Sequence, residues 1–346
     1  MNSAPFQIGS ETIASGSRRT VNLPVSVLSD HTPVNLSVHV IHGRRPGPVV
    51  FVSAGIHGDE VIGVEIVRRL LRSPALKSLR GILLVVPIVN TFGFLNHSRY
   101  LPDRRDLNRS FPGSPGGSLA ARLADLFLTE VVCRSSLGID LHSAAIHRTN
   151  LPQIRVSPKE PALLTMARLF GAPVILPSTV RPGSLRGEAA ERGVPVLLFE
   201  AGEGLRFDEI AVRSGVSGIL RVLHSLEMLP ARGIQKLKSQ PLLCSNSSWM
   251  RAPVGGLVRT FRKEGDVVTE GTVLAAVSDP FGEVRTEVAA PHDGIIVGRS
   301  VLPVVNEGDA LFHLGKIASA PEAEATVEDL FAQLEADPMF DEDEII

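Results

Sequence analysis

The feature that most constrains the fold is an alternation of strand and helix patterns that begins near Pro48. Short apolar runs rich in β-branched residues alternate with segments whose apolar residues recur at helical spacing. These patterns predict strands over residues 47–56, 81–90, 137–142 and 194–202, and helices over residues 59–72, 118–132, 159–171 and 215–229. Because strands that are apolar throughout are buried on both faces, the pattern predicts an α/β domain with a mixed sheet flanked by helices, which we place at residues 1–238.

A repeated motif marks a second unit at residues 239–317. Residues 252–256 and 290–294 share the pattern Ala-Pro-x-x-Gly, and each is followed by a short apolar strand and then Glu-Gly-Asp. Two copies of one strand–turn–strand pattern predict a smaller all-β domain. This stretch resembles the biotinyl and lipoyl carrier domains, which implies a barrel-sandwich-like fold. The hairpin at residues 278–282 lacks the lysine that carriers modify, so we interpret the domain as a scaffold or channel wall.

The distribution of charge argues against nucleic acid and membranes as partners. The formal net charge is −2, which creates no global field toward either surface. The longest apolar runs are too short to span a bilayer. Acidic residues gather in residues 318–346, which contain no Lys or Arg. This composition predicts a solvated acidic tail, with a helical stretch over residues 327–336.

The N-terminal sequence and the cysteines indicate a cytoplasmic protein. The first 16 residues lack the charged start and apolar run of a secretory signal. Cys133 and Cys244 lie far apart, and neither belongs to a metal motif, as expected in a reducing compartment. The sequence leaves open whether the chain forms homo-oligomers.

Three polar segments lie at the ends of predicted strands or in the loops beyond them: Gly55–Glu60 (GIHGDE), Asp106–Arg109 (DLNR) and Asp140–His142 (DLH). In open α/β sheets, ligands bind outside the carboxyl ends of the strands. A helix that starts near Gly58 would place His57 and Glu60 about one turn apart on one side. With the imidazole of His142, these side chains form the two-histidine, one-carboxylate set that binds zinc and leaves a position for water.

Spacing alone does not single out this set. A bare His-x-x-Glu pair is also typical of a capped helix start or of a solvated ion pair. Four other histidines are equally eligible as ligands by residue type: His42, His97, His147 and His292.

The motifs Gly-x-His-Gly-Asp-Glu, Asp-Leu-Asn-Arg, Asp-Leu-His and Phe-Glu-x-Gly, in this order, resemble those of the succinylglutamate desuccinylase/aspartoacylase family. This family is a branch of the zinc carboxypeptidase superfamily, and the resemblance covers roughly residues 20–315. Within the family, the sequence most resembles the predicted bacterial deacylases. It implies a zinc-carboxypeptidase-like sheet, one Zn²⁺ per chain and a small-molecule substrate. The implied reaction is hydrolysis of an amide bond in an N-acylated amino acid or a similar carboxylate-bearing compound.

The resemblance also implies a role for individual residues. By motif position, the zinc ligands are His57, Glu60 and His142, the general base is Glu200, the substrate-carboxylate pair is Asn108 and Arg109, and the oxyanion-stabilising arginine is Arg99. Each role has an alternative in the residue types alone.

These alternatives stay open at the level of sequence. Glu200 is also explained as a helix-capping or salt-bridged acid, and Arg109 as the partner of Asp106. Asp140 either orients a metal ligand or caps local backbone. Asn150, beyond His142, is a further candidate for the pocket.

Two other functions compete with deacylation. A carboxypeptidase acting on short or isopeptide-linked peptides would use the same zinc centre. A catalytically silent zinc-binding protein would keep the fold and bind a partner through its β domain or acidic tail. If the protein is a deacylase, we expect the β domain to narrow the entrance of the active site and to select the acyl group through Arg251, Arg259 and Arg262.

Overall fold

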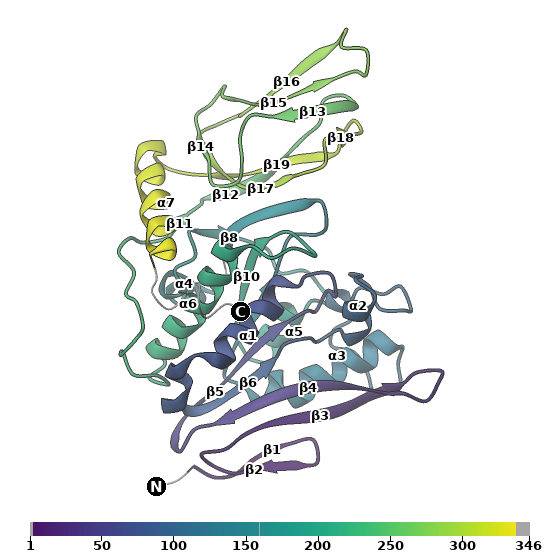
Figure 1. Cartoon of the computed structure of the whole chain (residues 1–346), viewed down its shortest axis with the longest axis vertical. Coiled ribbons are helices and arrows are strands. Elements are labelled where there is room, and N and C mark those ends of the chain that lie inside the picture. Colours follow the sequence, from purple (N-terminus) through teal and green to yellow (C-terminus); the bar gives the residue numbers. More distant parts are fainter. Residues whose placement is uncertain (1–2, 159, 337–346) are drawn as a thin grey trace.

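The computed structural model describes residues 3–158 and 160–336. Within these residues, a 13-stranded mixed sheet runs from the lower to the upper part of the molecule (Figure 1). The order along its main path is β12-β19-β17-β8-β10-β7-β5-β6-β4-β3. The strands of its lower part are β3 (Arg18–Val27), β4 (Pro33–His42), β5 (Arg45–Ala54), β6 (Arg80–Val86), β7 (Leu137–His142), β8 (Arg148–Val156), β9 (Val174–Pro177) and β10 (Val196–Gly202).

The central strands β10, β7, β5 and β6 are parallel, whereas β8, β4 and β3 join antiparallel. Two apolar cores form on the two faces of this sheet. One face is covered by α1 (Ile62–Arg72), α4 (Pro161–Phe170) and α6 (Glu209–Ser225). The other is covered by α2 (Thr91–Leu95), α3 (Leu119–Glu130) and α5 (Leu185–Glu191), with the small hairpin β1 (Phe6–Ile8) and β2 (Glu11–Ile13). The predicted α/β class with a mixed sheet flanked by helices is confirmed.

Helix α6 begins earlier than the helix predicted from residue 215, because Asp208 caps it and accepts a hydrogen bond from the Ala211 amide. Its glycines serve packing. A Cβ at Gly215 would lie 2.4 Å from a side-chain carbon of Ile66, and one at Gly218 would lie 2.3 Å from the Phe170 ring. These residues therefore let α1 and α4 approach closely, although glycine weakens a helical pattern in the sequence.

The upper part is all β, as the repeat predicts. Strands β12 (Asn246–Arg251), β17 (Gly294–Ser300) and β19 (Ala310–Lys316) extend the large sheet, because β17 pairs with β8. A separate sheet is formed by β13 (Gly256–Thr260), β15 (Val273–Ser278), β16 (Arg285–Ala289) and β18 (Val304–Val305). The short strands β11 (Leu242–Leu243) and β14 (Val267–Val268) belong to the large sheet, where they pair with β9 and β17. The lysine-free hairpin predicted at residues 278–282 connects β15 to β16.

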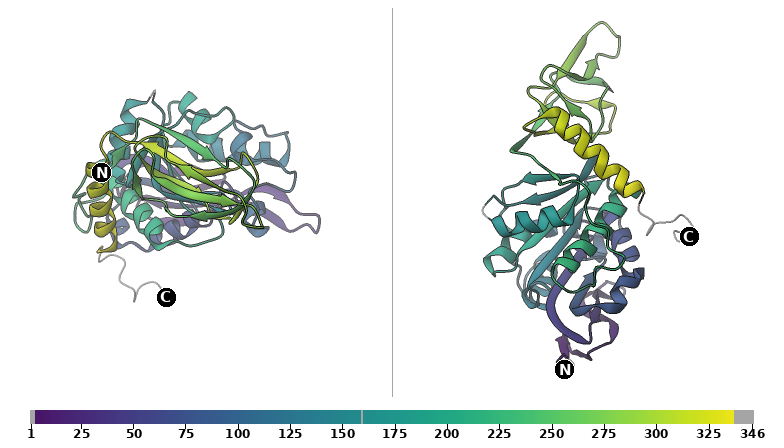
Figure 2. Two further views of the ribbon diagram at one scale, coloured as in Figure 1. Left: turned by 90° about the horizontal axis from the view of Figure 1, so that it is seen from above. Right: turned by 90° about the vertical axis from the view of Figure 1, so that its left-hand side faces the viewer.

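Residues 320–335 are not a solvated tail. They form α7 (Ala320–Glu335), a longer helix than the predicted stretch, which lies across both parts of the molecule (Figure 2). Ala323, Val327, Leu330 and Leu334 are buried, so this acidic segment is amphipathic and packs through its apolar side. The rest of the predicted tail, from residue 337, lies outside the described residues.

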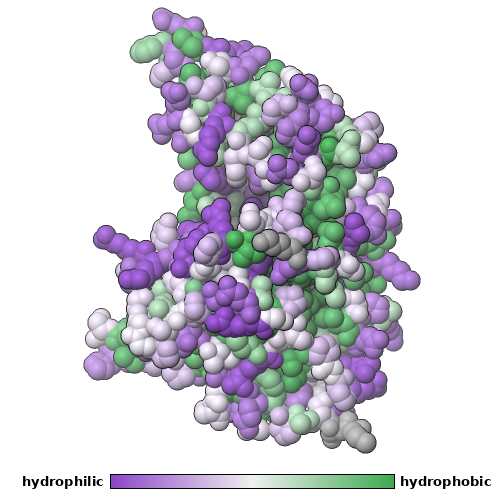
Figure 3. Space-filling model, turned by 180° about the vertical axis from the view of Figure 1, so that it is seen from behind, coloured by the Kyte–Doolittle hydropathy of each residue, from purple (hydrophilic) through white to green (hydrophobic). Residues whose placement is uncertain are grey.

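Seen from behind, the outline is indented where the upper β region meets the α/β part (Figure 3). Among the described residues, no helix has the length and apolar character needed to cross a membrane.

Candidate metal centre

The metal-ligand candidates lie at the carboxyl ends of two adjacent parallel strands. His57 and Glu60 follow β5, and His142 is the last residue of β7. The helix after β5 begins at Ile62 rather than near Gly58, so the pair lies in a turn in which the Glu60 amide donates to the His57 carbonyl. A side chain at Gly58 would collide with the backbone of Gly93, which explains the glycine in this turn.

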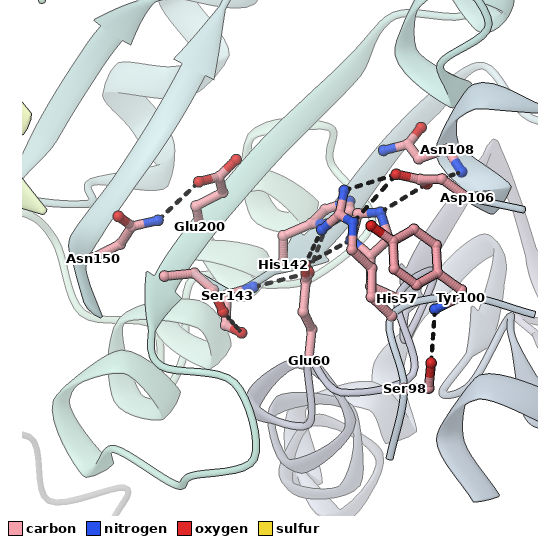
Figure 4. A network of polar contacts seen from close by, with 12 residues as sticks. His57, Glu60, Ser98, Tyr100, Asp106, Asn108, His142, Ser143, Asn150 and Glu200 are labelled. Carbon is pink, nitrogen blue, oxygen red and sulfur yellow. Dashed lines mark hydrogen bonds and ion pairs between the residues drawn. The ribbon is translucent and has the colours of Figure 1, made fainter. Parts of the chain in front are cut away.

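The three side chains converge on one point. Ligand atoms of His57, Glu60 and His142 all lie within 4.8 Å of one another, and all three residues are buried. Nδ1 of His57 is 2.6 Å from Glu60 Oε1, and Nδ1 of His142 is 2.8 Å from Glu60 Oε2 (Figure 4). Two imidazoles and one carboxylate at this spacing fit a zinc site with an open position. Among the described residues, the other candidate histidines belong to no comparable cluster.

Through its Nε2 atom, each imidazole also contacts a second carboxylate. Nε2 of His142 is 2.8 Å from Asp140 Oδ2, and Nε2 of His57 is 3.2 Å from Asp106 Oδ1. Asp140 also accepts a hydrogen bond of 2.7 Å from the Ser53 hydroxyl. Carboxylates in this position orient the ring and raise the basicity of a metal-binding histidine. The sequence leaves such a role open for Asp140, whereas it does not predict the contact between Asp106 and His57.

In the absence of a metal, the charged groups of this cluster shift one another's pKa values. Burial acts to lower the pKa of both imidazoles, but neighbouring carboxylates raise the pKa of His57 above its usual value, and that of His142 well above it. Burial acts to raise the pKa of Glu60, but the two histidines hold it far below its usual range. In the metal-free cluster the two imidazoles therefore hold protons more tightly than ordinary histidines, and metal binding must displace the protons that they carry.

We expect the metal-free protein to gain most stability from this cluster between pH 4.5 and 6.5, the ordinary values of the two residue types. The raised imidazole pKa values give stability that is complete below 6.5 and is lost as the pH rises through the higher folded values. The lowered Glu60 pKa gives stability that is complete above 4.5 and is lost as the pH falls. Thermal unfolding of chelator-treated protein across this range checks the prediction. A Tm that keeps rising above pH 7 would contradict it.

Arg99 lies directly beside the cluster. Its guanidinium is 2.9 Å from Asp106 Oδ2 and 3.4 Å from Glu60 Oε1. Burial acts to lower the Arg99 pKa, but these acids raise it, so the side chain is a fixed cation at the metal centre. The alternative in which Asp106 pairs with Arg109 is wrong, because Asp106 pairs with Arg99 instead.

Asn108 and Arg109 lie on a 3₁₀ turn, Leu107–Arg109, at the same pocket. The Asn108 side-chain oxygen accepts a 2.9 Å hydrogen bond from the Leu185 amide. This bond occupies the oxygen and leaves the NH₂ group as a donor for a ligand. The Arg109 guanidinium bonds to the carbonyl oxygen of Asn108 and is exposed.

Glu200 reaches the pocket from β10. Its Oε2 accepts a hydrogen bond of 2.9 Å from Asn150 and lies 2.7 Å from an Arg155 nitrogen, both on β8. An irregularity in the β8–β10 register lies between the positions opposite Gln153 and Asn150. Between these positions β8 has one residue more than the facing stretch of β10. The extra residue puts Asn150 on the same face of the sheet as Arg155, so both side chains reach the carboxylate of Glu200. Glu200 is thus a salt-bridged acid that also lines the pocket, and Asn150 faces the pocket too.

The pocket is a cavity of 290 Å³ rich in arginine. Besides the metal centre and Glu200, its walls include Arg99, Arg109, Arg148, Arg155, Arg181 and Arg186. The β region contributes Trp249, and the three arginines expected from sequence, Arg251, Arg259 and Arg262, do not line it. Arg155 and Trp249 were missed, although an arginine inside an apolar strand and the chain's single tryptophan are both signals of special placement.

Comparison with known proteins places these motifs in a family context. A model of the succinylglutamate desuccinylase/aspartoacylase catalytic domain matches residues 46–226, just over half of the chain, and includes the whole metal centre and Glu200. The chain is 28% identical over 291 residues to the N-alpha-acetyl-L-2,4-diaminobutyric acid deacetylase of Halomonas elongata, covering 80% of this chain and 84% of that protein.

Solved structures share the fold. The product-bound ectoine utilization protein EutE (DoeB) of Ruegeria pomeroyi has a TM-score of 0.77 at 24% identity, covering 87% of this chain and 95% of that one. An aspartoacylase family protein of Mesorhizobium loti has a TM-score of 0.77 at 21% identity, covering 92% and 99%. Both matches extend well beyond residue 226, so the upper β region is part of the shared architecture.

Proposed function

Since this chain belongs to the succinylglutamate desuccinylase/aspartoacylase family, we propose that it hydrolyses the amide bond of an N-acylated amino acid at a zinc ion held by His57, Glu60 and His142. The observation that carries this proposal is the convergence of two Nδ1 atoms and one carboxylate in an arginine-rich pocket. When bound, zinc supplies a Lewis acid and lowers the pKa of water to about 7. The Halomonas relative is named for an N-acylated amino acid, which agrees with this substrate class.

Glu200 acts as the general base in this proposal. Asn150 and Arg155 both hold Oε2, and no described residue bonds to Oε1, which leaves one carboxylate oxygen for the attacking water. Glu200 takes a proton from that water and passes it to the leaving nitrogen. The guanidinium of Arg99 stabilises the negative charge that develops on the carbonyl oxygen.

Asn108 and Arg109 bind the carboxylate of the amino acid. Arg109 presents a planar fork of donors, and the free NH₂ of Asn108 adds another. We further propose that residues 1–238 carry the catalytic groups and that residues 239–317 close the pocket through Trp249.

Hydrolysis of an N-acyl amino acid panel by zinc-loaded protein tests this function. We expect release of free amino acid from acyl derivatives, with little release from dipeptides. Activity on dipeptides alone would favour the carboxypeptidase alternative. Bound zinc without turnover on either panel would favour the silent binding protein.

Replacing Arg109 by lysine should raise KM about 10- to 100-fold and change kcat little, because one ammonium cannot reproduce two parallel hydrogen bonds to a carboxylate. Steady-state kinetics on the best panel substrate measure this effect. Arg105→Lys is the matched control, since Arg105 is exposed and does not line the pocket. An unaltered KM in Arg109→Lys would make Arg109 a structural residue.

A further inference from the structure

We propose that a basic cavity at the opposite edge of the sheet from the metal centre binds the phosphate group of a small molecule. The cavity measures 870 Å³ and lies where β3, β5 and β6 begin, where β4 ends and where the chain leaves α6. The metal centre lies beyond the other end of β5, a strand about 30 Å long at roughly 3.3 Å per residue. Ligand binding at the cavity can therefore be tested whether or not the proposed hydrolysis takes place.

The cavity carries an excess of positive charge. Of the described residues that line it, five are cationic and one, Glu227, is acidic. The cations are Arg18, Arg44, Arg45, Lys77 and Arg80. Because the whole chain has a formal net charge of −2, this concentration of cations is a local feature. A cavity lined mainly by charges of one sign focuses their field, so this cavity attracts anions.

No carboxylate neutralises these cations. Among the described residues, none of the five forms an ion pair, whereas the neighbouring Arg19, which does not line the cavity, pairs with Glu11 at 2.9 Å. Arg18 donates a 3.2 Å hydrogen bond to the carbonyl oxygen of Leu71, which leaves its charge uncompensated. A phosphate group carries up to two negative charges and three acceptor oxygens, so it can bind several of these donors at once.

Two residues of the cavity wall bury polar atoms that have no partner among the described residues, namely Nε of Arg80 and Nε2 of His42. The two side chains lie on the same face of the sheet, because His42 is opposite Ile82 in the β4–β6 register. Nδ1 of His42 is 3.1 Å from the Ile13 carbonyl oxygen and donates to it, so Nε2 of the neutral ring is an acceptor. A phosphate can satisfy both atoms, since its oxygens accept from Arg80 and its protonated form donates to His42.

Backbone hydrogen bonds hold the segments that carry the cations. The Gly16 amide donates to the His42 carbonyl at 2.9 Å, and the Arg80 amide donates to the Met228 carbonyl at 2.9 Å. A Cβ at Gly16 would lie 2.8 Å from Cγ of Arg44, so glycine at this position lets the Arg44 side chain pass close to the backbone. A site that is fixed in this way loses less conformational entropy when it binds a ligand.

The size of the cavity favours an organic phosphate over the inorganic ion. Its 870 Å³ is about three times the 290 Å³ of the catalytic pocket and lies within the range of about 300–1,000 Å³ that small-molecule sites occupy. Leu76, Leu79 and Leu229 also line the cavity and provide an apolar surface for the rest of the ligand.

Calorimetric titration of the purified protein with adenosine 5′-monophosphate, inorganic phosphate and adenosine tests the inference. Wild type should bind the two phosphates and not the uncharged nucleoside. Tighter binding of adenosine 5′-monophosphate identifies an organic phosphate as the ligand, and equal or tighter binding of inorganic phosphate identifies the ion itself. The double variant Arg45→Gln, Lys77→Gln should bind both phosphates about 10- to 100-fold more weakly. Because both side chains are exposed, this variant should fold and keep the wild-type rate of hydrolysis.

Thermal unfolding gives a second measurement, because a ligand that binds the folded state raises Tm. Adenosine 5′-monophosphate or phosphate should raise the Tm of wild type and leave that of the double variant nearly unchanged.

The double variant Arg168→Gln, Arg259→Gln is the matched control, because it removes the same number of charges from exposed positions outside the cavity. It should bind phosphate as wild type does. Arg109→Gln, which removes a cation from the catalytic pocket, should do the same. Absence of phosphate binding in wild type would overturn the inference, as would equal affinities in wild type and Arg45→Gln, Lys77→Gln. A loss of affinity confined to Arg109→Gln would place the phosphate in the catalytic pocket and would also reject it.

Discussion

Glu200→Gln should retain zinc and lose on the order of 10²- to 10⁴-fold in kcat, the contribution of a positioned general base. The glutamine amide has nearly the shape of the glutamate carboxylate. The contacts of this side chain with β8 therefore lose a negative charge, but the volume of the side chain hardly changes. It cannot accept the water's proton, however, and it leaves Arg155 without its anionic partner. KM should change much less than kcat, because Glu200 does not contact the proposed substrate carboxylate.

Steady-state kinetics with parallel metal analysis measure this prediction. Glu203→Gln is the matched control: Glu203 lies three residues away and bonds to the His147 amide and Arg206, outside the pocket lining. Near-normal turnover in Glu200→Gln would show that the pair with Arg155 is structural and that another group moves the proton.

His142→Ala should lose both metal and activity. It removes one of three ligand side chains and leaves the carboxylates of Glu60 and Asp140 facing each other without the imidazole between them. Loss of a supporting carboxylate costs about 10- to 100-fold in metal affinity, so loss of a ligand itself should exceed 100-fold.

Asp140→Asn gives the graded comparison. It keeps all three ligands but weakens the support of His142, so it should bind zinc about 10- to 100-fold more weakly and recover activity when zinc is raised. Competition with a chromogenic chelator gives both affinities. Wild-type zinc affinity in His142→Ala would mean that the metal binds elsewhere in the chain.

The fold class could be predicted because the central strands are apolar along their length. Because these strands are buried on both faces, apolar and polar residues do not alternate along them, and each strand appears as one apolar run. Strand β7 has the predicted bounds. Strand β3 was missed, because its solvent-facing residues interrupt the apolar pattern. The segment after residue 319 was misjudged because its acidic residues hide the apolar side through which α7 packs.

The convergence of His57, Glu60 and His142 could be predicted because their motifs together resemble those of a known family, whereas spacing alone did not single them out. The supporting contacts could not, since they depend on register and on loop geometry. A pair between Asp106 and Arg109, its near neighbour in sequence, was one alternative, but the loop turns Asp106 toward His57 and Arg99. The place of Trp249 at the pocket wall depends on a row of pairings across β12, β19, β17 and β8, which the pattern of a single strand does not predict.

Metal content of the purified protein, determined by elemental analysis, tests the central claim most directly. Wild type should contain about one zinc per chain, as a site with two imidazoles and one carboxylate predicts, and His142→Ala should contain none. His292→Ala, which removes a histidine outside the cluster, should match wild type. A wild-type protein that holds no metal after zinc is supplied and the excess removed would contradict the account.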